Sequence, residues 1–554
     1  MSAKRASDEL LFLPLGGTGE IGMNLNLYGW AGRWLMVDLG VTFARDTLPG
    51  VEVLMPDPAF IEARREQLDG LVLTHAHEDH IGAVGHLWER LRCPIYATAF
   101  TAELVRPKLA EAGIEEQAVI TEVPLSGRLT VGPFEIELIT LTHSIPEPNA
   151  LVIRTPAGTI LHTGDWKFDP DPVIGDDYDE DALRALSKEG VLALICDSTN
   201  ALVEGDSGSE GEIADSLAEV IGRQTGAVAV ACFASNVARL ESVVRAAERH
   251  GRRVVLAGRS MHRIVAAAQA TGYLTDLPPF LSEEQVGYLP RDEVLILCTG
   301  SQGEPRAALW RIARDDHPHI VLEEGDTVIF SSRVIPGNET SIHALQNELV
   351  RQGIAVISDS DEEIHVSGHP ARDELAQMYQ WVRPEVSVPV HGEIRHLMEH
   401  AKLARECQVP QSIVGANGSL IRLAPGRPEI VDQVESGRLA LDGNRLLPVD
   451  STVLRERKRV VYNGAASAVV LLDERGVLIE PPRLSLLGVI DPESESDIAE
   501  EACEAVERAL DRLPARALDD DQRVREIVTA AVRKTVNTAI GKKPVTHVEV
   551  IRLD

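Results

Sequence analysis

The sequence is poor in cysteine. It has six cysteines in 554 residues, and no two of them form a C-x-x-C pair. This spacing excludes a dense disulfide framework and a zinc site built from thiolate pairs, and it predicts a reducing, cytoplasmic location. Cysteines inside apolar stretches, such as Cys196 and Cys232, are expected to fill the core.

Long hydrophobic runs are also missing. No apolar stretch approaches the roughly 18 residues that suggest a membrane-spanning helix. The N-terminal residues show no extended apolar segment followed by a small-residue cleavage site. We therefore expect no membrane partner.

Positive charge and aromatic residues are scarce. The 54 Lys and Arg residues face 86 Asp and Glu residues, which gives a net charge of −32. Taken alone, this excess argues against nucleic-acid binding, because neutralising phosphates requires Lys and Arg. With 4% aromatic residues, broad stacking platforms for single strands are not expected either. The average does not locate the charge, however, and a cleft can still be locally positive.

The chain is too long for one domain, and its pattern changes along its length. Residues 10–160 contain short strands separated by turns, whereas residues from about 210 alternate apolar strands with amphipathic helices. The alternation predicts a mostly parallel sheet covered by helices. Residues 354–369 are expected as a strand ending in histidine, and the polar stretch 436–460 as a linker. Residues 461–554 predict a small α+β domain.

Several predicted strands end in residues that can bind metal. His75, His143, Asp165 and Asp197 each follow an apolar, strand-like segment, and so does His391 much later in the chain. In layered α/β proteins, sites are commonly built where such strand ends and loops converge. The sequence therefore predicts a site assembled from distant segments.

The stretch LTHAHEDHIGAV, residues 73–84, carries the strongest signal. His75 and His77 are two apart on an extended segment, so their side chains point the same way. Asp79 and His80 fall on the turn into the next helix and point to a second position. Imidazole and carboxylate groups suit zinc and manganese. These positions predict two adjacent metal sites; the alternative is a solvated polar turn.

Two metal ions need more ligands than this cluster supplies. His143 in LTHSIPEP, Asp165 in HTGDWKFD and His391 in VPVHGE are candidates, and the carboxylate could bridge the ions. Each of the three, taken alone, is more simply an ordinary loop residue. The prediction depends on all of them meeting at one place.

Ordered motifs make the chain resemble the bacterial ribonuclease J family. THAHEDHIG is similar to the H-x-H-x-D-H signature of metallo-β-lactamase-fold hydrolases. Asp197 in CDSTNA, His369 in HVSGH and His391 in PVHGE resemble motifs A, B and C of the β-CASP branch, which acts on nucleic acids. Four further motifs make the resemblance specific to the ribonuclease J family: LGGTGEIGMN, FASNVARL, CTGSQGEP and IPGNE. Ala76 departs from the family's usual Thr or Ser, but this is not a ligand position.

The resemblance implies an α/β fold: a metallo-β-lactamase αββα sandwich with an inserted β-CASP domain. The sandwich would comprise residues 1–210 and 351–435, and the β-CASP domain residues 211–350. The small α+β domain at 461–554 would serve oligomerisation. The alternative for that domain is a self-contained core.

The resemblance also implies a ligand set for two divalent cations, Zn²⁺ or Mn²⁺. The implied ligands are His75, His77 and His143 for the first ion, Asp79, His80 and His391 for the second, and Asp165 as a bridge. A hydroxide between the ions would attack the phosphodiester, with Asp79 also counted among the catalytic residues. His369 would serve as donor or stabiliser at the phosphate and leaving group, and Asp197 would orient a ligand histidine.

Segments rich in small polar donors are the implied RNA contacts. They are Phe233, Ser235, Asn236, His365, Val366, Ser367, Gly368 and His369. The alternative for each segment is ordinary strand–helix turn chemistry. A pocket for a terminal phosphate beside the metals would explain the removal of single nucleotides from a 5′-monophosphate end.

Residues 17–22, GTGEIG, match the G-x-G-x-x-G pattern of dinucleotide-binding proteins. That motif requires a helix directly afterwards. The residues that follow, MNLNLYGW, alternate as in a strand. We therefore expect a tight turn near the metal site instead.

We predict a cytoplasmic, dinuclear-metal ribonuclease that acts 5′ to 3′ on single-stranded RNA and also cuts internally, in mRNA decay and rRNA maturation. It would form a homodimer or homotetramer. Two alternatives stay open: a small-molecule metallo-hydrolase and a non-catalytic RNA-binding paralogue. Residues 210–350 argue against the first alternative, and the complete set of seven ligand candidates argues against the second.

Overall fold

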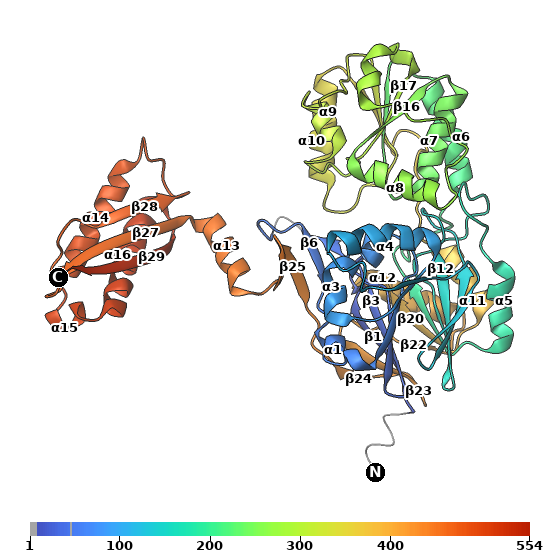
Figure 1. Cartoon of the computed structure of the whole chain (residues 1–554), viewed down its shortest axis with the longest axis horizontal. Helices are drawn as coiled ribbons and strands as arrows, with labels where there is room; N and C mark the ends of the chain where they lie inside the picture. Colours follow the sequence, from blue (N-terminus) through green and yellow to red (C-terminus); the bar gives the residue numbers. More distant parts are fainter. Residues whose placement is uncertain (1–7, 45–46, 554) are drawn as a thin grey trace. The chain divides into compact units, whose positions relative to one another are not determined.

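The computed structural model describes residues 8–44 and 47–553, which form two compact units. One unit comprises residues up to 42 together with 55–437, and the other comprises residues 43–54 and those from 438 onward. The larger unit holds a two-sheet sandwich and a separate parallel sheet with its own helices (Figure 1). No helix among the described residues is both long and apolar enough to cross a membrane.

The first sheet of the sandwich has eight strands. In spatial order they are β24 (Glu429–Gln433), β23 (Ser419–Ala424), β1 (Leu10–Gly16), β3 (Leu25–Trp30), β4 (Arg33–Val37), β7 (Leu68–Val72), β8 (Ile95–Ala97) and β9 (Ile120–Glu122). Strands β4, β7, β8 and β9 are parallel, with Val37 opposite Val72. Their carboxyl ends therefore lie at one edge, where the loop that carries His75 begins.

The second sheet has seven strands. They are β10 (Arg128–Val131), β11 (Phe134–Thr140), β12 (Asn149–Thr155), β13 (Gly158–His162), β14 (Ala193–Asp197), β20 (Val386–Val390) and β22 (Gln411–Ser412). β13, β14 and β20 are parallel neighbours. Because parallel strands end at the same edge, the residues that follow them meet there.

The two sheets enclose the main core. Inward-facing side chains such as Phe12 and Tyr28 from one sheet pack with Phe134 and Ile195 from the other. A second core forms between the outer face of the second sheet and its helices, α5 (Glu180–Glu189), α11 (Arg372–Val382) and α12 (Ile394–Glu406). Helices α3 (Val84–Leu91) and α4 (Ala99–Glu111) pack on each other and follow strands of the first sheet. The expected αββα sandwich is confirmed.

The inserted segment forms a parallel five-stranded sheet. Its order is β16 (Arg253–Ala257), β17 (Val294–Cys298), β15 (Val228–Ala231), β18 (Thr327–Phe330) and β19 (Ala355–Ile357). Its helices are α6 (Glu210–Gly222), α7 (Val237–Arg249), α8 (Arg259–Ala270), α9 (Ala308–Ala313) and α10 (Glu339–Arg351). After β19 the chain returns to both sheets of the sandwich through β20, β22, β23 and β24.

Two expectations about local structure are wrong. The strand expected over 354–369 ends at Ile357, and the residues from Ser358 to the start of α11 form turns and irregular chain. Acidic and small residues in this stretch offer no apolar face for a sheet to bury. The stretch 436–460, expected as a linker, instead contains β25 (Arg438–Asp442), β26 (Arg445–Pro448) and the start of α13 (Thr452–Asn463).

The turn at residues 17–22 lies beside the metal-ligand candidates, as expected. It leads into β3 rather than a helix, and β2 (Thr18–Gly19) pairs with β21 (Gly392–Glu393). The carbonyl of Gly17 accepts a hydrogen bond of 2.6 Å from the backbone N–H of His391. The glycines thus position the loop that carries His391.

The smaller unit is built on a three-stranded sheet, in the order β28 (Arg483–Leu487), β27 (Ala465–Asp473) and β29 (Val545–Leu553). Helices α14 (Ser496–Leu510) and α16 (Asp521–Ile540) pack together, and buried valines of α16 at every fourth position meet apolar residues of β27. Two helices and a closing strand were expected here. The residue ranges of the predicted domains stay predictions.

Candidate metal centre

Ligand candidates in one helix and after four strands lie close together in space. His75 and His77 follow β7, Asp79 and His80 lie in α2 (Glu78–Ile81), and His143 follows β11. Asp165 and His391 follow β13 and β20. The ligand atoms of His75, His77, His143 and Asp165 lie within 4.8 Å of one another, and so do those of Asp79, His80, Asp165 and His391.

The first group has the spacing of a tetrahedral metal site. His77 Nδ1 lies 3.1 Å from His75 Nε2 and 3.0 Å from His143 Nε2. Ligands about 2.0–2.1 Å from a zinc ion stand about 3.3 Å apart in a tetrahedron. Three imidazole nitrogens facing one another at this distance fit a shared cation.

Asp165 joins the two groups. Its Oδ2 lies 3.1 Å from His80 Nε2, 3.6 Å from His391 Nε2 and 3.8 Å from His75 Nε2. Asp79 Oδ2 lies 3.7 Å from His391 Nε2. One carboxylate thus faces ligands of both groups, which is the arrangement expected of a bridging acid.

Two buried polar atoms without hydrogen-bond partners also indicate that these residues fit two divalent cations. Asp165 Oδ1 and His391 Nε2 are buried and have no hydrogen-bond partner. Leaving a buried polar atom unpaired costs about 1–3 kcal/mol, so such atoms call for an explanation. Here both belong to the ligand groups, and a cation would satisfy each of them.

Most ligand histidines are oriented by a hydrogen bond to the other ring nitrogen. The Nδ1 partners are Thr74 at 3.0 Å for His75, Asp38 at 2.7 Å for His80, Asn24 at 3.0 Å for His391 and the Gly368 carbonyl for His143. Such contacts fix the tautomer and aim Nε2 at the metal position. His77 is the exception, since its Nδ1 itself faces the ligand atoms of His75 and His143.

Burial holds several of these rings neutral. It lowers the pKa of His75 and His143 well below the usual value and lowers that of His77 to about 4. These rings therefore keep a free lone pair at neutral pH. His80 differs: burial lowers its pKa, but Asp165, Asp38 and Asp79 outweigh burial and raise it well above the usual value.

Metal binding at His80 should therefore release a proton. At neutral pH the metal-free ring carries a proton on Nε2 that a cation must displace, so apparent affinity should rise about tenfold per pH unit below the raised pKa. Calorimetry of metal uptake in two buffers with different ionisation enthalpies measures this release. Uptake with no change in bound protons near neutral pH would show that the His80 ring is already neutral.

Asp38 was not predicted as a site residue from the sequence, although it directly follows β4 in the stretch MVDLG. It is fully buried, has a φ of +63°, and accepts hydrogen bonds from the backbone and hydroxyl of Thr74 as well as from His80. A positive φ at a residue other than glycine is strained and persists where the surroundings impose it. The available signal was an acidic residue directly after the strand that neighbours the one preceding His75.

Replacing Asp38 by Asn should weaken metal binding about 10–100-fold. The amide N–H facing His80 Nδ1 would favour the tautomer that protonates Nε2, so this ring would lose its ligand lone pair. Metal titration of the purified variant measures the effect. The control is Asp176→Asn, which removes one negative charge at an exposed position. Equal affinity in the two variants would remove Asp38 from the account.

Asp197 contacts a different histidine from the one expected, and its role stays a prediction. It does not contact a ligand histidine; its Oδ2 lies 2.8 Å from Nδ1 of His369, and its Oδ1 accepts from the backbone and hydroxyl of Thr199. Although burial lowers the pKa of His369, Asp197 with Asp165 and Asp79 raises it to about 9. Asp197 therefore holds His369 in its protonated form.

The loop that carries His369 is fixed against the metal ligands. The Gly368 carbonyl accepts from His143, and a Cβ on Gly368 would lie 2.7 Å from that ring. Asn200 donates to the Ser367 hydroxyl at 2.8 Å and to the His369 carbonyl at 3.0 Å. Only glycine allows this close approach, which explains the G in HVSGH.

His365 lies among positive charges. Burial, together with Arg239, Arg333 and Lys167, lowers its pKa to about 3, and its Nδ1 is buried without a partner. Arg239 is itself fully buried and is bound to Glu210, Ser331 and the Ile364 carbonyl. Glu210 neutralises Arg239, and Lys167 lies 2.8 Å from Asp169, so Arg333 is the cation near this ring that has no ion-pair partner among the described residues. The sequence pointed to His365 but not to these three cations.

One residue of the FASN segment caps a helix, and the predicted RNA contacts of this segment stay a prediction. Asn236 is buried and caps α7, because its side chain accepts from the backbone of Arg239 at 2.9 Å while its amide faces Glu210. Phe233 and Ser235 are half-buried in the same loop. Among the described hydrogen bonds, none joins these three residues to the metal-ligand candidates. Val366, also a predicted RNA contact, is buried.

Four family models match the chain. Residues 28–207 match the metallo-beta-lactamase superfamily, and residues 225–349 match the beta-CASP domain of ribonuclease J. Residues 361–410 match the Zn-dependent metallo-hydrolase RNA specificity domain, and residues 452–553 match the ribonuclease J C-terminal domain.

Whole-chain relatives agree with these matches. Ribonuclease J of Sinorhizobium meliloti is 46% identical over 551 residues, covering 99% of this chain and 98% of that protein. The chain belongs to the ribonuclease J family. Ribonuclease J of Thermus thermophilus is 36% identical, covering 97% of this chain and 94% of the relative. That of Corynebacterium glutamicum is also 36% identical, covering 98% of this chain and 76% of the relative.

The family and fold predicted from the sequence are thereby confirmed. Membership of the ribonuclease J family also supports the prediction of a metal-dependent ribonuclease. A solved structure of a protein of unknown function from Enterococcus faecalis aligns with a TM-score of 0.50 at 15% identity, covering 78% of this chain and 100% of that one. This likeness supports the fold alone.

Proposed function

We propose that this ribonuclease J family member is a dinuclear-metal 5′-to-3′ exoribonuclease that prefers 5′-monophosphorylated single-stranded RNA and also cuts internally. Its proposed processes are mRNA decay and rRNA maturation, in the cytoplasm and as a homo-oligomer. The observation that carries the proposal is the position of Asp165, whose ligand oxygen lies within reach of both groups of ligand residues.

The ligand groups suggest how hydrolysis proceeds. Two divalent cations, zinc or manganese, would supply a water of lowered pKa and offset charge on the phosphate. The chain's own residues hold the surroundings fixed: Asp38, Asn24 and Thr74 orient the ligand rings. His369, kept protonated by Asp197, can donate a hydrogen bond or proton to the leaving oxygen.

The proposed binding region for a terminal phosphate lies next to this site. Ser367 and Gly368 are in the same short loop as His369, and His365 precedes them among the side chains of Arg239, Arg333 and Lys167. Arg333, the one of these cations without an ion-pair partner among the described residues, favours an anion there. The loop carbonyl of Gly368 accepts a hydrogen bond from the metal-ligand candidate His143. Binding of a 5′-monophosphate at this loop would place the first phosphodiester near the metals.

Product analysis on one RNA sequence with three different 5′ ends tests the proposal. A 5′-monophosphate end should give mononucleotides from the 5′ side, whereas triphosphate and hydroxyl ends should be degraded more slowly. His77→Ala is the control for metal-dependent cleavage. Equal internal fragmentation of all three RNAs would contradict the exonuclease assignment, and cleavage that survives in the His77 variant would contradict the metal centre.

A further inference from the structure

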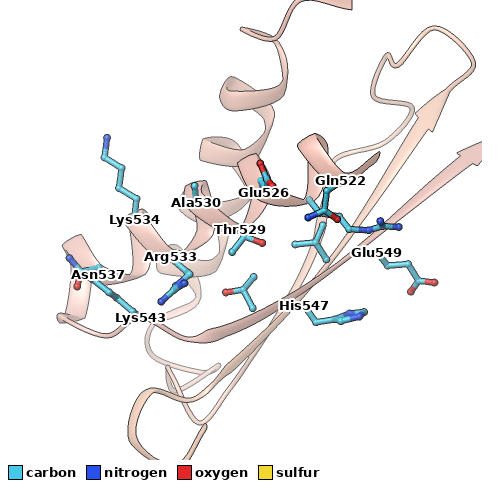
Figure 2. A pocket seen from close by; sticks show the side chains of 13 residues that line it. Gln522, Glu526, Thr529, Ala530, Arg533, Lys534, Asn537, Lys543, His547 and Glu549 are labelled. Atoms are coloured by element: carbon cyan, nitrogen blue, oxygen red, sulfur yellow. The ribbon is translucent and has the colours of Figure 1, made fainter. Parts of the chain in front are cut away.

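A polar groove of about 1120 Å³ lies within the smaller unit, between helix α16 and strand β29 (Figure 2). One wall is a face of α16 that includes Arg525, Thr529, Arg533 and Asn537. These positions are four residues apart, so they share one side of the helix. The groove is separate from the metal-ligand candidates, all of which belong to the larger unit.

Positive charges along this groove are not neutralised. Arg525, Arg533 and Lys543 are exposed, and none of them has an ion-pair partner among the described residues. Many other cations are paired; Arg523 on the same helix lies 3.0 Å from Glu526. Unpaired cations stand out in a chain whose net charge is −32.

The acidic residues of the groove compensate for little of this charge. Glu526 is the partner of Arg523, and Figure 2 shows its side chain on the far side of the helix from β29. Arg533 points toward the strand in the same view. Glu549 projects from β29 at one end of the groove. The middle of the groove is therefore positive.

Neutral donors complete the lining. The hydroxyl of Thr529 and the amide of Asn537 line the groove. The Thr546 hydroxyl also lines it but donates to the Pro544 carbonyl at 3.0 Å. β29 is the edge of its sheet, so its outer backbone N–H groups have no strand partner among the described residues. Arginine, lysine, hydroxyl and backbone N–H groups are the donors that proteins use for phosphates.

We infer that this groove binds the sugar–phosphate backbone of single-stranded RNA at a second position, outside the catalytic site. The inference deepens the proposed function, since it takes RNA as the polymer that the chain holds. Arg525 and Arg533 are eight residues apart, or about 12 Å along the helix, so more than one phosphate can be contacted. No Phe, Tyr or Trp side chain lines the groove, so binding should depend little on base sequence.

The test compares two double variants of the full-length protein. Arg533→Glu with Lys543→Glu reverses two charges in the groove. Arg512→Glu with Arg516→Glu makes the same charge change at exposed positions of the same unit that do not line it. Binding of single-stranded oligoadenylate is measured by fluorescence anisotropy on metal-free protein, so that RNA is not hydrolysed.

The groove variant should bind oligoadenylate about tenfold more weakly at low salt. The slope of the logarithm of its binding constant against the logarithm of salt concentration should be shallower by about 1.4, since each lost phosphate contact removes about 0.7. The control should stay within about twofold. Hydrolysis of a 5′-phosphorylated dinucleotide, too short to occupy a second position, should be unchanged in both metal-loaded variants. A dinucleotide that wild type fails to cleave would count against the proposed function and leave the binding test intact.

Three results would overturn the inference. The first is an equal loss of oligoadenylate affinity in both double variants. The second is wild-type oligoadenylate affinity in the groove variant. The third is a groove variant that keeps oligoadenylate binding but loses binding of polyglutamate. The last result would assign the groove to an acidic protein segment. Circular dichroism of both variants checks that the smaller unit stays folded.

Discussion

Replacing Asp165 by Asn should remove both metal ions and lower the rate of RNA hydrolysis by about 10³-fold or more. Loss of a residue that orients one ligand typically costs about 10–100-fold. Asp165 faces His80, His391 and His75 directly, and it is shared by both ligand groups, so its loss should cost more. Metal analysis of the purified variant and single-turnover cleavage of 5′-monophosphorylated RNA measure the two effects.

The matched control for Asp165→Asn is Asp176→Asn, an exposed acid a short distance along the chain. It should retain metal and activity. The Asp165 variant should remain folded, because asparagine has nearly the same volume and keeps a hydrogen-bonding side chain at this position. Two bound ions in the folded Asp165 variant would show that this residue does not bridge the centre.

Replacing His369 by Ala should lower the rate of cleavage about 10²–10⁴-fold, the range for loss of a general acid. Metal content should stay near the wild-type value, because both ligand groups are complete without His369. This combination separates His369 from Asp165. Loss of metal together with activity would instead make His369 a ligand, since its ligand atom also lies within 4.8 Å of those of Asp165, Asp197 and His391.

The pH–rate profile gives an independent check on His369. Asp197 raises the pKa of His369 to about 9 against the effect of burial, so the ring is protonated below that pH and loses its proton above it. Cations bound beside the ring lower this pKa by repulsion. The rate should therefore fall as pH rises toward about 9, and in Asp197→Asn the fall should begin at lower pH. An unchanged alkaline limb in that variant would contradict the role of Asp197.

The ligand candidates were predictable because their pattern is local. His75, His77, Asp79 and His80 lie within six positions, and an extended segment followed by a turn fixes their directions. Asp165 and His391 were recognisable only as strand-end residues, since nothing in the order of the chain shows that β13 and β20 lie on either side of β14. The family resemblance supplied what spacing alone could not.

The residues that orient the ligands could not be predicted in this way. Asp38 and Asn24 contact His80 and His391, which lie 42 and 367 positions away in the chain. Asp197 matched a motif, but its partner depends on the path of the loop that carries His369. Residue type and spacing limit what a side chain can do, whereas its partner is decided by which loops the sheets bring together.

The location of positive charge in the smaller unit likewise could not be predicted from the sequence. Averages over the sequence pointed to an acidic chain with little capacity for nucleic acid. The amphipathic pattern of α16 fixes its buried valines, and its exposed side contributes arginines to a groove. Where the charges gather depends on β29, which closes the sheet at the end of the chain.

Anomalous X-ray diffraction from crystals grown with manganese or zinc tests the central claim most directly. The account predicts two anomalous peaks about 3.5–4 Å apart, with the Asp165 carboxylate between them. His75, His77 and His143 should surround one peak, and Asp79, His80 and His391 the other. A single peak, or none in the folded and metal-saturated protein, would contradict the dinuclear centre on which the proposed hydrolysis depends.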